Sequence, residues 1–250
     1  MKMNTIPIRR NFVLLACLTL TLAFLWVICT AEPSVADPLI KKNKRQYTTD
    51  FRLDACTFST TGSNEYFILE PGYQLNLAGE EKGVLIELSI TVLNETEMVG
   101  DIETRVVEEM EREDGELVEV SRNFFAICNE TNSVFYFGED VDIYEDGEIV
   151  SHEGAWRAFE NGNLPGLIMP GIILLGARYF QEIAPEIALD RAEIVKMDAT
   201  LQVPLDEFEN VLVTLETSPL APGEKDLKFY APGVGLIKDE AAELIEIVNP

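Results

Sequence analysis

The sequence predicts a mainly β fold: an antiparallel meander that forms a curved sheet or partial barrel, with little helix beyond an N-terminal signal. Between Gly83 and Leu236, short runs rich in β-branched residues alternate with clusters of turn residues. Asp114-Gly115 and Asp146-Gly147 each interrupt two extended runs. Asp-Gly is a strong hairpin signal because both residues tolerate positive φ. The sequences around the two dipeptides are similar, which indicates one hairpin style used twice.

The expected strands follow one another along the chain. In the first half they cover residues 84–93, 102–110, 117–128, 134–144 and 149–156, with a turn expected at 94–98. In the second half they cover residues 177–183, 192–197, 199–204, 211–217, 227–231 and 236–238, before a final apolar stretch at 241–248. Alternation in Val118-Glu119-Val120-Ser121 and in Phe135-Tyr136-Phe137-Gly138 predicts one buried face and one wet face.

The first 36 residues predict export. A basic start precedes an uncharged apolar run over residues 12–28, and Ser34-Val35-Ala36 fits a signal-peptidase site. An uncleaved signal-anchor is the alternative, because the apolar run approaches the ~20 residues that span a bilayer. Basic residues at 41–45 also resist translocation.

These features divide the chain into a signal peptide or signal-anchor (1–36), a linker (37–50) and a single β-rich domain (51–250). The expected location is therefore periplasmic, cell-surface or extracellular. If the leader is not cleaved, residues 12–28 would anchor the protein in a membrane.

The chain is strongly acidic, with a formal net charge of −25 at pH 7. This charge argues against a nucleic-acid partner, because a duplex binder needs a basic face. We expect membrane contact only through an uncleaved leader, and we expect a monomer. The content of 47% hydrophobic residues is that of a folded chain with a core.

Cys56 and Cys128 are the cysteines that lie beyond the predicted leader. In an oxidising compartment they predict one disulfide. Two buried free thiols are the alternative, and the sequence alone does not decide between them.

No catalytic signature is visible. The single histidine, His152, lies on a predicted strand, and no Gly-x-Ser-x-Gly elbow accompanies it. No set of His and Cys residues has the spacing of a zinc site. We therefore expect no catalytic residue, no metal site and no cofactor.

Residues 142–153 place acidic residues and Gly147 at several positions of an EF-hand template. Tyr144 stands where the template needs a ligand, and the flanking runs look extended. A plain hairpin is therefore the preferred interpretation. Weak calcium binding by acidic loops is the alternative.

The segment 164–175 is apolar but interrupted by Pro and Gly, so it fits neither a long helix nor a regular strand. It must be covered, either by filling its own core or by meeting a ligand or partner. The candidate ligand-binding residues are Leu167, Ile168, Met169, Ile172, Leu174 and Leu175.

Three motifs carry a resemblance to other proteins. They are Phe-Tyr-Phe-Gly-Glu-Asp-Val-Asp at 135–142, His-Glu-Gly-Ala-Trp at 152–156 and Lys-Phe-Tyr-Ala-Pro-Gly-Val-Gly-Leu at 228–236. With them, residues 60–248 resemble a group of uncharacterised exported bacterial and archaeal proteins that has no known activity. The apolar residues 172–175 depart from that group's more polar segment. The resemblance implies an exported, curved β body somewhat like periplasmic lipid carriers, which is a fold analogy.

Three functional hypotheses follow. The first is a non-enzymatic exported module that binds an apolar small molecule or an envelope protein in or at the mouth of the curved sheet. The second is a structural or adhesive surface domain with calcium on its acidic loops. The third is a hydrolase, which would need carboxylates that converge in a pocket.

Overall fold

A computed structural model describes residues 46–250 of the chain. The predicted signal at 1–36 and most of the predicted linker lie outside these residues. Within 46–250 the only helical element is the 3₁₀ turn η1 (Leu53–Ala55), and no helix there has the length and hydropathy needed to cross a membrane. The prediction of a mainly β fold with a curved antiparallel sheet is confirmed.

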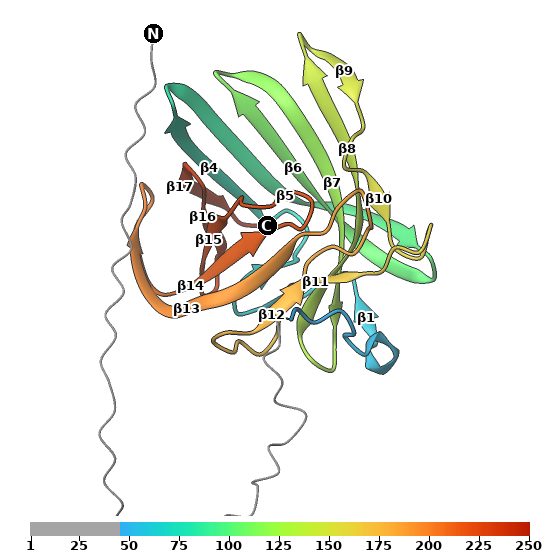
Figure 1. Cartoon of the computed structure of the whole chain (residues 1–250). Helices are drawn as coiled ribbons and strands as arrows, with labels where there is room; N and C mark the ends of the chain where they lie inside the picture. Colours follow the sequence, from blue (N-terminus) through green and yellow to red (C-terminus); the bar gives the residue numbers. More distant parts are fainter. Residues whose placement is uncertain (1–45) are drawn as a thin grey trace, which may run out of the picture. The chain divides into compact units, whose positions relative to one another are not determined.

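Fifteen strands form one antiparallel sheet, whose long members dominate Figure 1. In chain order they are β1 (Phe58–Ser59), β4 (Gln74–Glu81), β5 (Val84–Val99), β6 (Ile102–Glu113), β7 (Glu116–Cys128), β8 (Ser133–Glu145), β9 (Glu148–Ser151), β10 (Trp156–Arg157), β11 (Gly166–Met169), β12 (Arg178–Phe180), β13 (Arg191–Gln202), β14 (Glu207–Thr217), β15 (Asp226–Ala231), β16 (Gly235–Asp239) and β17 (Ala242–Val248). A separate small sheet pairs β2 (Ser63–Asn64) with β3 (Phe67–Ile68).

The strand order explains how the sheet curves. Its main path is β10-β8-β7-β6-β5-β4-β17-β16-β15-β14-β13-β12, with β1 on β7, and with β9 and β11 on β8. The last strand, β17, pairs with β4 and so joins the two halves of the chain. Figure 1 shows β5 to β8 as one tall wall, with β13 and β14 across from it. At one end β11 lies against β12, where Leu164 bridges Ile183.

Both Asp-Gly hairpins are confirmed. Asp114 and Gly115 join β6 to β7 with φ values of 49° and 86°, and Asp146 and Gly147 join β8 to β9 with φ values of 51° and 79°. Two consecutive positive φ values give the turn whose twist matches that of the flanking strands. Residues 142–153 therefore form a hairpin and not a helix–loop–helix.

Several predicted strand limits are wrong. β5 continues through residues 94–98, where a turn was expected, and β13 continues through Asp198. Both strands contain shifts of register, which absorb the irregular residues as β-bulges do. The predicted strand at 149–156 is instead two short strands, β9 and β10.

The centre of β8 is buried on both faces, although the sequence pattern predicts one wet face. Phe135 and Phe137 both make edge contacts with Phe58 of β1. Tyr136 points the other way and packs on Phe125 of β7. The wet face is lost because the N-terminal part of the described chain covers the strand from outside.

A disulfide holds this covering segment in place. Cys56 and Cys128 are bonded, with their Cα atoms 5.1 Å apart, and β1 pairs with the end of β7 beside them. Of the two alternatives left open by the sequence, the structure contains the disulfide.

Residues 47 and 48, which lie in the predicted linker (37–50), make contacts with the sheet. Thr48 exchanges backbone hydrogen bonds with Arg178 and Phe180 of β12. The Tyr47 ring lies against Phe180 and under the Arg191 guanidinium. This end of the predicted linker therefore packs against β12 and β13.

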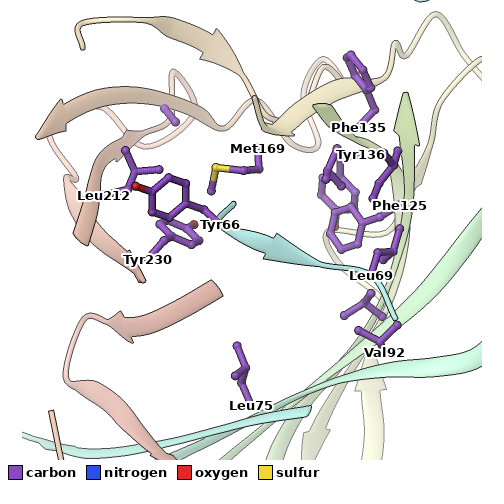
Figure 2. Close-up of a cluster of buried hydrophobic side chains, with 14 of the residues drawn as sticks. Tyr66, Leu69, Leu75, Val92, Phe125, Phe135, Tyr136, Met169, Leu212 and Tyr230 are labelled. Carbon is purple, nitrogen blue, oxygen red and sulfur yellow. The ribbon is translucent and has the colours of Figure 1, made fainter. Parts of the chain in front are cut away.

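The apolar core fills the end of the curved sheet that β11 and β12 bring together. Figure 2 shows Tyr66, Met169, Leu212 and Tyr230 gathered near one another, with Phe125 on the strands across from them. Tyr66 comes from the turn between β2 and β3 and donates a hydrogen bond to the Asn210 carbonyl. The small sheet therefore closes this end of the interior with aromatic side chains.

Candidate functional site

The concave face of the sheet changes from apolar to acidic along its strands. On β6, Val107 lies opposite Val92, while Glu109 lies opposite Ser121 and Glu111 opposite Glu119. Directly opposed residues of antiparallel strands point to the same face. The wet face that alternation predicts for β7, with Glu119 and Ser121, is therefore the inside of the curved sheet.

A cavity of about 640 Å³ opens in the acidic part of this face. That volume lies in the range of small-molecule sites. Ten carboxylates line the cavity: Glu81, Glu111, Glu113, Glu182, Asp190, Glu216, Glu224, Asp226, Asp239 and Glu240. Its apolar lining consists of Ile86, Leu88, Ile187, Ala188, Leu220, Ala221, Ala241 and Ala242. A concave site lined by one sign of charge concentrates the potential and attracts the opposite charge.

Lys228 is the one basic residue among the lining residues of this cavity. Its Nζ atom lies 3.1 Å from an Asp239 oxygen and 3.5 Å from a Glu216 oxygen. Burial lowers the pKa of Lys228, but the charges of Glu216 and Asp239 outweigh it and hold that pKa well above the ordinary value. Lys228 is therefore charged, and it pairs with two of the carboxylates, so that the group of three keeps an excess of negative charge.

A smaller cavity of about 100 Å³ lies on the apolar side of Lys228. Lys228 lines both cavities, so the two meet at this side chain. The smaller one is lined mainly by apolar and aromatic residues: Phe67, Ile68, Tyr73, Leu75, Ile90, Val92, Val107, Phe125, Ile168, Tyr230, Val234 and Leu236. At the edge of this cavity, the Tyr73 hydroxyl donates a hydrogen bond to the Val234 carbonyl and so has a polar partner.

Glu109 is the carboxylate of the smaller cavity. Within residues 46–250 no hydrogen bond or ion pair joins it to another side chain. Burial raises the pKa of Glu109 from 4.5 to about 7, and the Lys228 charge only partly opposes this rise. Removing a carboxylate from water is costly unless a partner or a proton compensates.

Two further glutamates inside the sheet have raised pKa values. Burial raises the pKa of Glu139 to about 7, although a hydrogen bond from Tyr136 lowers it. The pKa of Glu182 lies well above the ordinary value because of burial and, next, the charge of Glu139. The interior therefore holds protons on carboxylates near neutral pH.

The residues predicted to bind a ligand are divided by the structure. Ile168 lines the smaller cavity, Leu167 is half-buried, and Met169 is buried in the core. The other three lie outside both cavities and are exposed, with fractions of 73% for Ile172, 61% for Leu174 and 67% for Leu175.

Sequence reasoning missed the carboxylates of the concave face. Glutamate is frequent throughout the chain, so no local pattern distinguishes Glu111 on the inside from Glu108 on the opposite face of the same strand. The only local signal is the two-residue spacing of Glu109, Glu111 and Glu113 along β6, which places three carboxylates on one face.

His152 lies away from both cavities. Its Nδ1 atom is 2.8 Å from an Asp142 oxygen and 2.9 Å from the Val141 carbonyl, and 68% of its side chain is exposed. The Ser151 hydroxyl next to it accepts a hydrogen bond from the Glu153 backbone. These contacts tie the end of β9 to β8.

One group of possible metal ligands occurs in the described part of the chain: Cys56, Cys128 and Glu130, whose ligand atoms lie within 4.8 Å of one another. Both sulfur atoms are committed to the disulfide, so this group does not form a metal site. Glu130 instead accepts a hydrogen bond from the Thr57 backbone.

Comparison of the chain with protein-family models, with curated proteins and with solved structures finds no match.

Proposed function

We propose that the protein is an exported, non-enzymatic binding module that holds a small amphiphilic molecule against the concave face of its sheet. One observation carries this proposal: the acidic cavity and the apolar cavity meet at Lys228. Neighbouring polar and apolar cavities suit a ligand that has both a polar and an apolar part.

The arrangement of the core supports the same proposal. The aromatic residues around Tyr66 and Tyr230 fill the closed end of the interior, whereas the acidic end stays hollow. A purely structural sheet of this size would bury its polar face less, because each buried carboxylate costs stability. Export remains a prediction from the leader, and it is part of the proposal.

Native mass spectrometry of the gently purified exported protein tests the proposal directly. We expect a bound small molecule that is lost on denaturation. Ile168→Trp, which fills the smaller cavity, should reduce the bound fraction. Leu174→Trp is the matched control, because Leu174 comes from the same segment but lies outside both cavities. A protein that always emerges empty and binds no amphiphilic probe would refute the proposal.

A second candidate is a hydrolase that uses paired carboxylates. Glu109 and Glu139, which have raised pKa values, lie inside the same curved sheet as the carboxylates that pair with Lys228. One protonated and one ionised carboxyl group is the arrangement of glycoside hydrolysis. Turnover of chromogenic glycosides that Glu109→Gln abolishes, while Glu108→Gln does not, would favour this candidate over a binding module.

A further inference from the structure

The two cavities that share Lys228 also indicate the charge of the ligand. Ten carboxylates and one lysine line the larger cavity, and Lys228 pairs with only two of them. Glu81 pairs with Lys82. The other carboxylates on the wall, such as Glu111 and Glu113, form no ion pair with a described residue. The site therefore has a large excess of acidic groups facing one open cavity.

Glu109 provides an observation that does not depend on the larger cavity. Its carboxyl group lies in the smaller, apolar cavity and has no hydrogen-bonding or ion-pairing partner within residues 46–250. Glu109 is half-buried. A carboxyl group placed among apolar side chains without a close partner loses part of its hydration, so such groups are usually paired in the working state of a protein. A cationic ligand group in the adjoining acidic cavity would bring a second positive charge toward Glu109, beside that of Lys228.

Lys228 shows which chemistry fits at the junction. Its side chain lines the apolar cavity, while its ammonium group reaches Asp239 and Glu216. An alkyl stem along apolar surface with a charged end in a polar region is the usual behaviour of lysine. The protein's own side chain thus places an alkylammonium group across the boundary between the two cavities.

We infer that the ligand is a cationic amphiphile, an alkylammonium or guanidinium compound whose charged group lies among the carboxylates of the larger cavity and whose short apolar part enters the smaller one. This inference rests on the proposed function and names its ligand class. An anionic ligand would meet the same carboxylates with like charge, which is unfavourable in a concave acidic site.

Three probes of equal chain length test the inference: n-octylamine, n-octanol and n-octanoate. Titration calorimetry with the purified exported protein at pH 8 measures each dissociation constant. At that pH the amine is protonated, since alkylammonium groups have pKa values near 10. We expect n-octylamine to bind about tenfold more tightly than n-octanol, and n-octanoate to bind more weakly still.

A matched pair of variants shows where the amine binds. Glu111→Gln removes one carboxylate from the cavity wall, and Glu108→Gln makes the same change on the opposite face of β6. We expect Glu111→Gln to weaken n-octylamine binding about threefold to tenfold, with no change for Glu108→Gln. Neither residue makes a side-chain hydrogen bond in the structure, so both variants should fold.

The outcomes separate the two proposals. If no probe binds, the proposed function fails. If n-octanol or n-octanoate binds as tightly as n-octylamine, the proposed function stands and the cationic ligand is refuted. Equal effects of Glu111→Gln and Glu108→Gln would refute the location, because they would indicate attraction by the overall charge of the protein.

Discussion

Lys228 Nζ lies 3.1 Å from an oxygen of Asp239, its direct partner across β15 and β16. The pair stands where the acidic and the apolar cavities meet, and Glu216 adds a second carboxylate at 3.5 Å. A single cation among so many carboxylates stabilises the fold by offsetting their repulsion. The energetic consequence of removing it is therefore larger than that of removing a surface lysine.

Lys228→Met keeps the length of the side chain and removes its charge. We expect it to lower the free energy of unfolding by about 2–3 kcal/mol at pH 8, because it leaves Asp239 and Glu216 without a counter-charge in a partly buried site. Urea denaturation measures the loss. Lys225→Met is the control, since Lys225 is exposed, and it should change stability by less than about 0.5 kcal/mol. Equal losses in the two variants would contradict this role of Lys228.

Stability should fall as the pH rises from about 4.5 to about 7. The pKa values of Glu109 and Glu139 are raised from 4.5 to about 7 in the folded protein. In this interval the folded state holds more protons than the unfolded state, so each rise in pH favours unfolding. Below pH 4.5 the two carboxyl groups are protonated in both the folded and the unfolded protein, and above pH 7 they are ionised in both. These two groups therefore do not make the free energy of unfolding depend on pH outside the interval.

Glu109→Gln tests this pH dependence because it replaces the titrating group by a neutral isostere. We expect the variant to be more stable than the parent by about 1–2 kcal/mol at pH 8 and to match it near pH 4.5. Urea denaturation at a series of pH values between 4.5 and 8 measures the difference. The high net charge of the protein also makes the free energy of unfolding depend on pH. Glu108→Gln, which removes a carboxylate from the opposite face of β6, controls for this effect. Identical profiles for the parent and Glu109→Gln would show that Glu109 does not titrate in this range.

Local signals explain what the sequence predicts correctly. Both Asp-Gly turns are set by the conformational freedom of two adjacent residues, and the strands beside them follow from alternation. Bulges are harder to predict, because Asn94 in a bulge and Asn94 in a turn have the same local sequence. The register with β6 decides between the two.

The site could not be predicted for a geometrical reason. Alternation shows that Glu119 and Val118 point to opposite faces of β7, but the side that becomes the inside depends on the curvature of the whole sheet. That curvature requires β17 to pair with β4, which lies far away in the sequence. Phe135 is covered from outside by Phe58, which is also distant in the sequence. The disulfide between Cys56 and Cys128 holds the segment that contains Phe58 in this position.

The two halves of the apolar segment at 164–175 should respond differently to truncation. Met169→Ala removes a side chain that is 1% exposed, and we expect a loss of about 2–4 kcal/mol from the cavity it leaves. Leu174→Ala changes a side chain that is 61% exposed and should change stability by less than about 0.5 kcal/mol. Thermal and urea denaturation of both variants provide the comparison. A large loss for Leu174→Ala would mean that this residue is covered in solution.

The disulfide should contribute strongly to stability because it closes a long loop. Cys56 and Cys128 are separated by 72 positions, for which loop closure predicts about 4 kcal/mol. We expect Cys56→Ala/Cys128→Ala to lose about that amount and to become sensitive to proteolysis near β1. The parent protein treated with a reductant should behave like the double variant. If the double variant keeps full stability and protease resistance, other contacts hold the segment over β8.

Gly138 is required where β8 meets β10. Its replacement should lower stability more than the replacement of another glycine that has a positive φ. Gly138 has a φ of 134°, and a Cβ atom there would lie 2.3 Å from the Trp156 carbonyl oxygen. Gly115 also has a positive φ, 86°, but a Cβ atom there meets nothing within 4 Å. Gly115→Ala should therefore cost only the backbone strain, about 1 kcal/mol. Gly138→Ala adds a backbone clash and should cost about 2–4 kcal/mol, measured by urea denaturation.

Because Trp156 packs on Tyr136 of the concave face, the clash should also shift β10 away from β8 and expose the Trp156 ring. Equal losses in the two variants would show that β10 can move aside without cost, and that its pairing with β8 does not hold this part of the wall in place.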